Sequence, residues 1–212
     1  MHYISHLSVD KRLKRILDKA EPHQLKKRKN ICTYLCASIM SQQLSTKVAD
    51  VIYKRFIGLY NGKEPTPQQI LETPFEKLRG IGLSNAKVGY VQNVAQFEIE
   101  FGMDAKKLNK MSNEEVIDYL LVIKGVGRWT IEMLLMFALG REDVFAIDDL
   151  GIQNAMISLY KLDNTDKKQL KEDMLLLSKK WSPYRTYACV HLWRWKDNVP
   201  IVKEKTLKEK IK

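Results

Sequence analysis

The sequence predicts an all-α protein. Helix-capping residues recur ahead of amphipathic stretches, and apolar residues repeat every three to four positions along most of the chain. No stretch alternates apolar and polar residues for long enough to predict a strand. Period 3.6 therefore dominates the pattern.

Nine segments have this helical periodicity. They are residues 9–19, 30–41, 46–60, 85–101, 113–122, 129–139, 150–160, 166–179 and 183–196. Thr66 with Gln69 and Ser112 with Glu115 have the spacing of capping boxes. Thr73 and Ser182 each precede a proline and are also predicted to cap helices, since proline is favoured at the first helical position.

Composition sets the class of partner. The 212 residues are 45% hydrophobic and 29% charged, which is enough apolar material for a chain that folds alone. The 36 Lys and Arg outnumber the 25 Asp and Glu, and a net charge of +11 favours a polyanion such as nucleic acid. Only 9 of these cations are arginines, so a general preference for lysine is the alternative explanation. A basic run at 26–29 and a Lys-rich tail at 203–212 are either solvated or in contact with phosphate.

Cysteine usage and hydropathy bear on the compartment. Cys32, Cys36 and Cys189 cannot all pair and cannot form a four-cysteine metal site, so we expect a reducing, intracellular environment. The longest apolar run, residues 133–139, is too short to span a bilayer. We expect a soluble chain with no membrane partner.

A glycine-containing turn lies between two predicted helices at residues 124–130, with the sequence KGVGRWT. Glycines at 125 and 127 permit positive φ angles and close backbone approach, and the following helix adds its positive end. Such a turn can bind a phosphate through backbone N–H groups. A tight helix–helix connection without a ligand is the alternative.

Two adjacent carboxylates, Asp148 and Asp149, precede the helix predicted at 150–160. Asp148 fits the role of N-cap. Asp149 would then lie in the first turn, where the helix dipole favours a negative charge. An ionised carboxylate there can stabilise a developing cation or orient a water molecule.

Together these motifs resemble the helix-hairpin-helix DNA glycosylases, and within them the branch of the bacterial-type 3-methyladenine DNA glycosylase II. The resemblance covers about residues 31–195. It rests on ordered motifs: SIMSQQLS at 38–45, LRGIGLSNAK at 78–87, the glycine turn, the aspartate pair, and WSPYRTYA at 181–188 followed by HLWR at 191–194.

The resemblance implies a monofunctional glycosylase that flips an alkylated base out of duplex DNA and hydrolyses its N-glycosidic bond. Asp149 aligns with the catalytic aspartate. Trp129 stands where bifunctional relatives have a lysine, and it has no amine for a Schiff base. A non-catalytic DNA-binding module and a bifunctional glycosylase/AP lyase are the alternatives, and the preferred lesion stays open.

The resemblance also assigns binding residues. Trp193, Trp129 and Met133 would line the base pocket, although the two tryptophans could instead be ordinary core aromatics. Gln43 would fill the gap left by the flipped base, and Ser45 would contact the minor groove of the DNA. The alternative is that Gln43 is an ordinary exposed turn residue. The hairpin contacts with DNA would come from Lys124, Gly125, Val126, Gly127, Arg128 and Thr130.

The implied architecture is one compact domain, residues 1–202, without an N-terminal β domain. One helical lobe would be 30–140, including the hairpin 123–128, and the other 1–29 plus 141–202, around a DNA-binding cleft. We expect a monomer acting on damaged double-stranded DNA, in the cytoplasm or nucleoid of a prokaryote or in a nucleus. The chemistry needs no cofactor; some relatives hold a structural Na⁺ or K⁺ on carbonyls matching Leu121, Ile123 and Val126.

Overall fold

The structure is a computed structural model that describes residues 2–198, so the Lys-rich tail at 203–212 lies outside the described residues. Over residues 2–198 it contains thirteen α-helices and one 3₁₀ helix, with no strand. The predicted all-α class is therefore confirmed. No helix in this part of the chain combines the length and apolar character needed to cross a bilayer.

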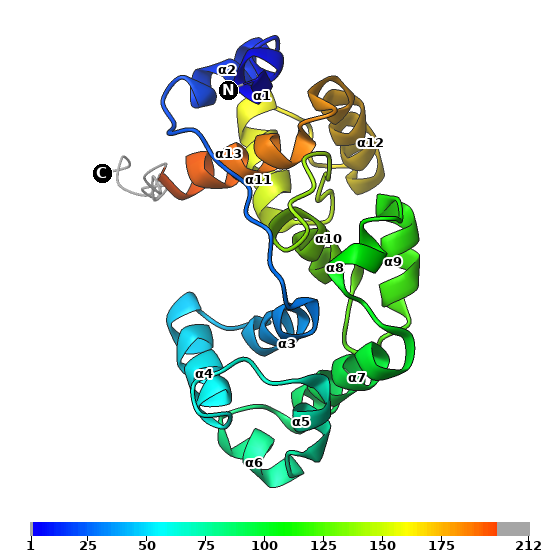
Figure 1. Cartoon of the computed structure of the whole chain (residues 1–212). Helices are drawn as coiled ribbons and strands as arrows, with labels where there is room; N and C mark the ends of the chain where they lie inside the picture. Colours follow the sequence, from blue (N-terminus) through cyan, green and yellow to red (C-terminus); the bar gives the residue numbers. More distant parts are fainter. Residues whose placement is uncertain (1, 199–212) are drawn as a thin grey trace, which may run out of the picture. The chain divides into compact units, whose positions relative to one another are not determined.

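The chain divides into two compact units. Residues 24–146 form one, which we call the central unit after its place in the sequence. The described residues before 24 and after 146 form the other, the terminal unit. Figure 1 shows the helices of each unit in sequence colours.

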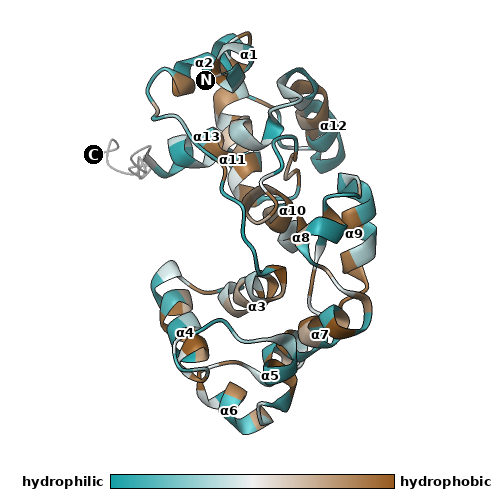
Figure 2. Cartoon of the chain, in the orientation of Figure 1, coloured by the Kyte–Doolittle hydropathy of each residue, from teal (hydrophilic) through white to brown (hydrophobic). Residues whose placement is uncertain are grey.

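The central unit is organised around one long helix, α7. Its helices are α3 (Ile31–Ser41), α4 (Thr46–Gly58), α5 (Pro67–Glu72), α6 (Phe75–Gly80), α7 (Asn85–Phe101), α8 (Ala105–Leu108), α9 (Asn113–Leu121) and α10 (Arg128–Phe137). Val88, Val91 and Val94 recur every three residues on α7 and are fully buried, because α3 and α5 pack on that face. In Figure 2 the apolar colouring of α10 contrasts with the mixed colouring of α4, which has one exposed face.

The terminal unit joins the two ends of the described chain. It contains α1 (His2–Leu7), α2 (Lys11–Leu17), α11 (Leu150–Tyr160), α12 (Lys167–Ser178), the 3₁₀ helix η1 (Lys179–Trp181) and α13 (Arg185–Asn198). α11 and α13 pack against each other, and α2 contacts both. Trp181 is the largest fully buried side chain of this core.

A buried carboxylate, Asp10, ties three elements of the terminal unit together. It accepts hydrogen bonds from Tyr160 Oη at 2.5 Å and Trp181 Nε1 at 3.0 Å, and Lys180 Nζ lies 3.0 Å away. Burial acts to raise the pKa of this carboxyl, but these three side chains and the backbone N–H of Leu13 outweigh it and lower the pKa of Asp10 to about 2. The depressed pKa means that the cluster stabilises the fold above pH 3.8 and loses this effect as the pH falls toward 2.

The predicted helix starts are partly right. Both capping boxes are present, with Thr66 and Ser112 as N-caps. Two others are wrong: Thr73 ends α5 instead of starting α6, because its hydroxyl bonds back to the carbonyl of Gln69 at 2.7 Å. Ser182 follows η1, and α13 begins only at Arg185.

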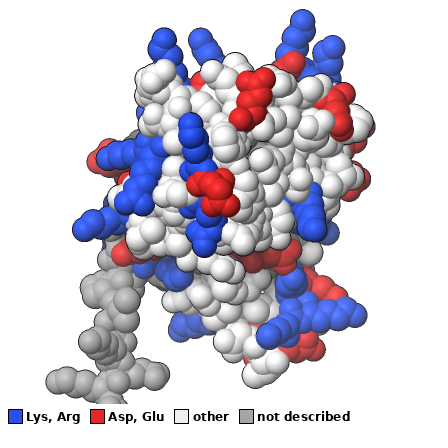
Figure 3. Space-filling model, turned by 90° about the horizontal axis from the view of Figure 1, so that it is seen from below, with Lys and Arg blue, Asp and Glu red and all other residues white. Residues whose placement is uncertain are grey.

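Charge is not gathered into one continuous area on the face shown in Figure 3. Basic side chains stand there in separate groups, with acidic side chains and uncharged surface between them. The net charge of +11 therefore does not by itself locate a binding surface on that face.

Candidate active site

Asp149 is the N-cap of α11. Its backbone is extended, with φ −74° and ψ 118°, and its Oδ1 accepts the N–H of Ile152 at 2.8 Å. The expectation that Asp148 caps this helix is wrong. Asp148 is exposed and forms an ion pair with Lys171 at 2.5 Å, so it is Asp149 that caps the helix predicted at 150–160.

Trp193 holds the same carboxylate from a second helix. Its Nε1 on α13 donates to Asp149 Oδ1 at 2.8 Å, and both side chains are partly exposed. Gln153 Nε2 donates to the carbonyl of Ile147 at 2.8 Å, which fixes the segment leading into Asp149. Two of the predicted site residues are therefore in direct contact at the surface, and Trp193 is not a fully buried core aromatic.

Gly151 makes this contact possible, although no role was predicted for it. A β-carbon at this position would lie 2.9 Å from Asp149 Oδ1, 2.9 Å from Trp193 Cδ1 and 3.0 Å from Trp193 Nε1. Only a residue without a side chain leaves room for the indole beside the carboxylate. A glycine two positions after a candidate carboxylate in the sequence was the signal that could have identified it.

The predicted hairpin is present between α9 and α10 in the central unit. Gly125 has φ +102°, and a β-carbon on it would lie 2.7 Å or less from three atoms of Tyr90. Gly127 is the N-cap of α10 and offers no side chain, so the first turn of that helix has no side-chain cap. Lys124 is exposed beside this turn, whereas the Val126 side chain is buried. The geometry suits an anion held by backbone N–H groups.

Other predicted residues of the hairpin helix differ in exposure. Trp129 is 42% exposed and so is not an ordinary core aromatic, while Met133 is 8% exposed. Thr130 is only 2% exposed, which limits any contact with a ligand to its backbone. Arg128 forms ion pairs with Glu114 at 3.0 Å and Glu132 at 3.2 Å, and these carboxylates offset part of its charge.

The turn between α3 and α4 carries Gln43 and Ser45. Gln43 is exposed and has φ +60°, a left-handed backbone conformation that residues other than glycine seldom adopt. Ser45 is the N-cap of α4, and its Oγ accepts the N–H of Val48 at 3.4 Å. Gln43 is therefore at the tip of a strained, solvent-facing turn.

The basic run at 26–29 belongs to the central unit and is hydrogen-bonded to the segment after α10. Its Arg28 N–H donates to the carbonyl of Ala138 at 2.8 Å. Three residues of the run border a cavity of about 560 Å³ that Tyr34 and Tyr53 also line. Burial raises the pKa of Tyr34 to about 12, so this phenol keeps its proton at physiological pH.

The predicted residues thus form two groups. Asp149 and Trp193 belong to the terminal unit, with Gly151 between them. The hairpin and the turn at Gln43 belong to the central unit. No group of His, Cys, Asp or Glu side chains among residues 2–198 could hold a metal ion.

Comparison with known proteins gives consistent matches. A family model described as HhH-GPD superfamily base excision DNA repair protein matches residues 36–182. DNA-3-methyladenine glycosylase 1 of Schizosaccharomyces pombe is 37% identical over 186 residues, which are 87% of this chain and 80% of that protein.

Solved structures agree with these matches. A 3-methyladenine DNA glycosylase of S. pombe in complex with abasic DNA has a TM-score of 0.81 and 34% identity, covering 94% of this chain and 98% of that one. A DNA-3-methyladenine glycosidase of Bacillus halodurans has a TM-score of 0.80 and 35% identity, covering 91% and 88%.

Proposed function

Because the chain belongs to the HhH-GPD superfamily of base excision DNA repair proteins, we propose that it removes alkylated bases of the 3-methyladenine type from double-stranded DNA. The reaction is hydrolysis of the N-glycosidic bond, and the product is an abasic site. The observation that carries this proposal is the contact between Asp149 and Trp193, a fixed carboxylate beside an aromatic ring. A module that only bound DNA would need neither group.

Asp149 supplies the electrostatic part of the mechanism. As the bond to the base breaks, positive charge develops on the deoxyribose, and a nearby carboxylate lowers the energy of that state. Hydrogen bonds from Ile152 N–H and Trp193 Nε1 fix the carboxylate before the substrate arrives. The same group orients the water molecule that attacks the sugar.

Trp193 supplies selectivity for alkylated purines. Alkylation places a positive charge on the purine ring, and an electron-rich indole face attracts such a cation by about 0.5–2 kcal/mol. A cationic base also leaves with little help from a general acid. Trp129, 42% exposed on α10, gives the central unit an exposed aromatic surface of its own.

The central unit holds the DNA strand. Backbone N–H groups at the start of α10, together with the Lys124 ammonium, bind phosphate without reading sequence. The nucleotide must leave the helical stack before its bond can be cut, and Gln43 fills the gap that it leaves. Carbonyls of Leu121, Ile123 and Val126, at the end of α9 and in the turn, are hard oxygen ligands that suit Na⁺ or K⁺. An ion held there would supply a positive charge for the phosphate.

The enzyme is monofunctional and acts as a monomer on DNA inside the cell. Strand cleavage by a glycosylase needs an amine that attacks the sugar, and Trp129 provides none. Incubation with methylated duplex DNA should therefore release free base and leave sites that break only on heating or in alkali. Binding without base release would favour the non-catalytic alternative, and direct nicking would favour the bifunctional one.

Gly151→Ala should lower the rate of base release by about tenfold or more, since displacement of a catalytic group by a fraction of an ångström is costly. The new methyl group must push Trp193 away from Asp149. Single-turnover excision at saturating enzyme measures the effect. Gly89→Ala is the matched control, because a β-carbon at Gly89 meets nothing within 4 Å. Equal rates for the two variants would show that the indole–carboxylate contact is dispensable.

A further inference from the structure

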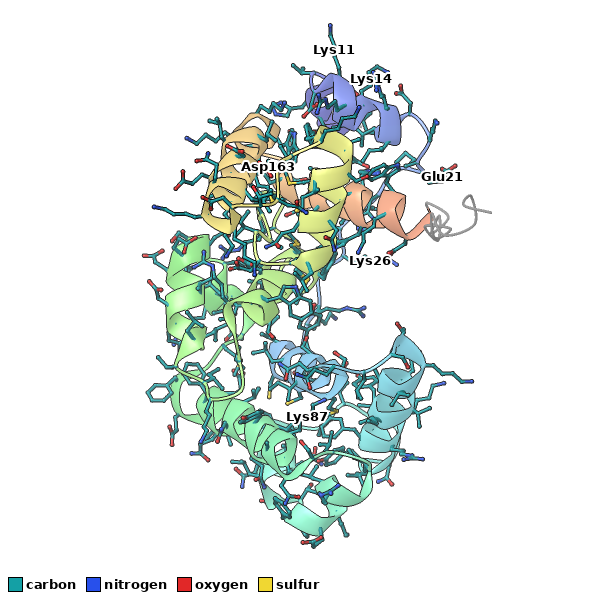
Figure 4. The ribbon with its side chains drawn as sticks, turned by 180° about the vertical axis from the view of Figure 1, so that it is seen from behind. Lys11, Lys14, Glu21, Lys26, Lys87 and Asp163 are labelled. Carbon is teal, nitrogen blue, oxygen red and sulfur yellow. The ribbon has the colours of Figure 1, made fainter. Side chains whose placement is uncertain are left out.

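One face of α7 contacts both DNA-binding elements of the central unit. Lys87, Tyr90 and Asn93 are spaced three residues apart, so they lie along one side of the helix. Lys87 reaches the end of α3, where the turn with Gln43 begins, and the other two reach the hairpin. Figure 4 shows Lys87 between α7 and α3.

Lys87 closes the carboxyl end of α3. Its Nζ donates to the carbonyl of Met40 at 2.9 Å and to that of Gln42 at 2.7 Å. Carbonyls in the last turn of a helix have no partner within the helix, and a cation is favoured at that end. Burial lowers the pKa of this partly buried ammonium. Lys87 thereby fixes the backbone immediately before Gln43.

The hairpin is held from the same face. The Tyr90 ring lies directly beneath Gly125, where no β-carbon would fit, and Asn93 Nδ2 donates to the carbonyl of Lys124 at 3.1 Å. Gln42 Nε2 donates to the carbonyl of Gly125 at 3.4 Å, which joins the turn to the hairpin directly. The two elements are thus connected both to α7 and to each other.

Strain in the turn explains why such support is needed. The left-handed conformation of Gln43 persists only where neighbouring contacts enforce it. Those contacts act on Gln42, whose carbonyl is held by Lys87 and whose side chain is held by the hairpin. Without Lys87, the turn keeps the bond from Leu44 N–H to the Ser41 carbonyl and the bond from the Gln42 side chain to the hairpin, but it loses both bonds that Lys87 makes to its backbone.

We propose that Lys87 is a positioning residue for base flipping, which holds the turn bearing Gln43 at a fixed separation from the phosphate-binding hairpin. This inference rests on the proposed function. Asn93 supports the hairpin end of the same arrangement. The motif around residues 78–87 therefore has a role beyond starting a helix.

The test compares two substrates in single-turnover excision. One carries an alkylated purine in a fully paired duplex, and the other carries the same lesion opposite an abasic site, where extrusion of the lesion costs less free energy. Lys87→Met should slow excision from the fully paired duplex by about 10- to 100-fold and from the duplex with the abasic site by less than about threefold. Lys106→Met, which removes an exposed lysine from α8, is the matched control and should change neither rate.

A second variant tests the inference if Lys87→Met does not fold, and a fluorescence signal reports base extrusion directly. Asn93→Ala should show the same difference between substrates, and it replaces Lys87→Met if circular dichroism shows that the lysine variant is unfolded. Fluorescence of 2-aminopurine placed at the target position reports extrusion and should rise less with either variant than with the wild type. Equal losses on both substrates, or no loss on either, would overturn the inference. If the wild type extrudes 2-aminopurine but releases no alkylated base, the proposed function fails while the fluorescence comparison still tests Lys87.

Discussion

Asp149→Asn is expected to lower the single-turnover rate of base release by at least about 100-fold, because in the proposed mechanism this carboxylate charge stabilises the cationic sugar. Asparagine still caps a helix and still offers an oxygen to Ile152 N–H and Trp193 Nε1, so the fold should survive. Affinity for DNA carrying an abasic-site analogue should be unchanged or higher. Quantified release of base from methylated DNA measures the first effect, and a binding titration measures the second.

The neighbouring carboxylate provides the control for this prediction. Asp148→Asn makes the same chemical change one residue away, at a side chain paired with Lys171 on the surface. It should retain base release within about twofold, since an exposed ion pair contributes little. Similar losses in both variants would mean that local negative charge, rather than the position of Asp149, drives the reaction.

Gly125→Ala is expected to destabilise the protein by about 2 kcal/mol or more and to weaken DNA binding. Alanine at φ +102° is strained, and its β-carbon would collide with the Tyr90 ring. The hairpin must then shift away from α7, which also displaces the start of α10. Urea denaturation measures the loss of stability, and fluorescence anisotropy with undamaged duplex measures the loss of affinity.

Gly127→Ala separates the two effects of this prediction. A β-carbon at Gly127 meets nothing within 4 Å, and its φ of −102° suits alanine, so stability should stay close to that of the wild type. DNA binding should nevertheless weaken, because a methyl group then stands at the start of the helix, where we propose that phosphate binds. Wild-type stability in Gly125→Ala would contradict the proposed packing of Tyr90 against the hairpin.

Local signals in the sequence accounted for most of the helices. The predicted segment at 85–101 coincides with α7, because a serine cap precedes it and its apolar residues keep one period throughout. α1 and α8, six and four residues long, were missed since they are too short to establish a period. Thr73 was misassigned because the same Thr-Pro pair can end one helix or start the next, and tertiary contacts decide between them.

The site was predictable in its chemistry but not in its contacts. A carboxylate at a helix start and an aromatic residue in the last helix were identified from motifs, yet nothing local indicated that Trp193 would bond to Asp149, 44 residues away. The role proposed for Lys87 depends on carbonyls of Met40 and Gln42, and no spacing rule relates residues so far apart. The error between Asp148 and Asp149 concerned only which carboxylate caps the helix, since the predicted bounds 150–160 are those of α11.

Helix α10 has no side-chain cap, and this bears on how DNA binding affects the stability of the protein. Most helices of the central unit start with a residue whose side chain accepts a hydrogen bond from the first turn, but Gly127 gives α10 no such side-chain cap. In the proposed function, a DNA phosphate bound at that position takes the place of the missing serine or aspartate. We therefore expect resistance to unfolding to grow with the concentration of duplex.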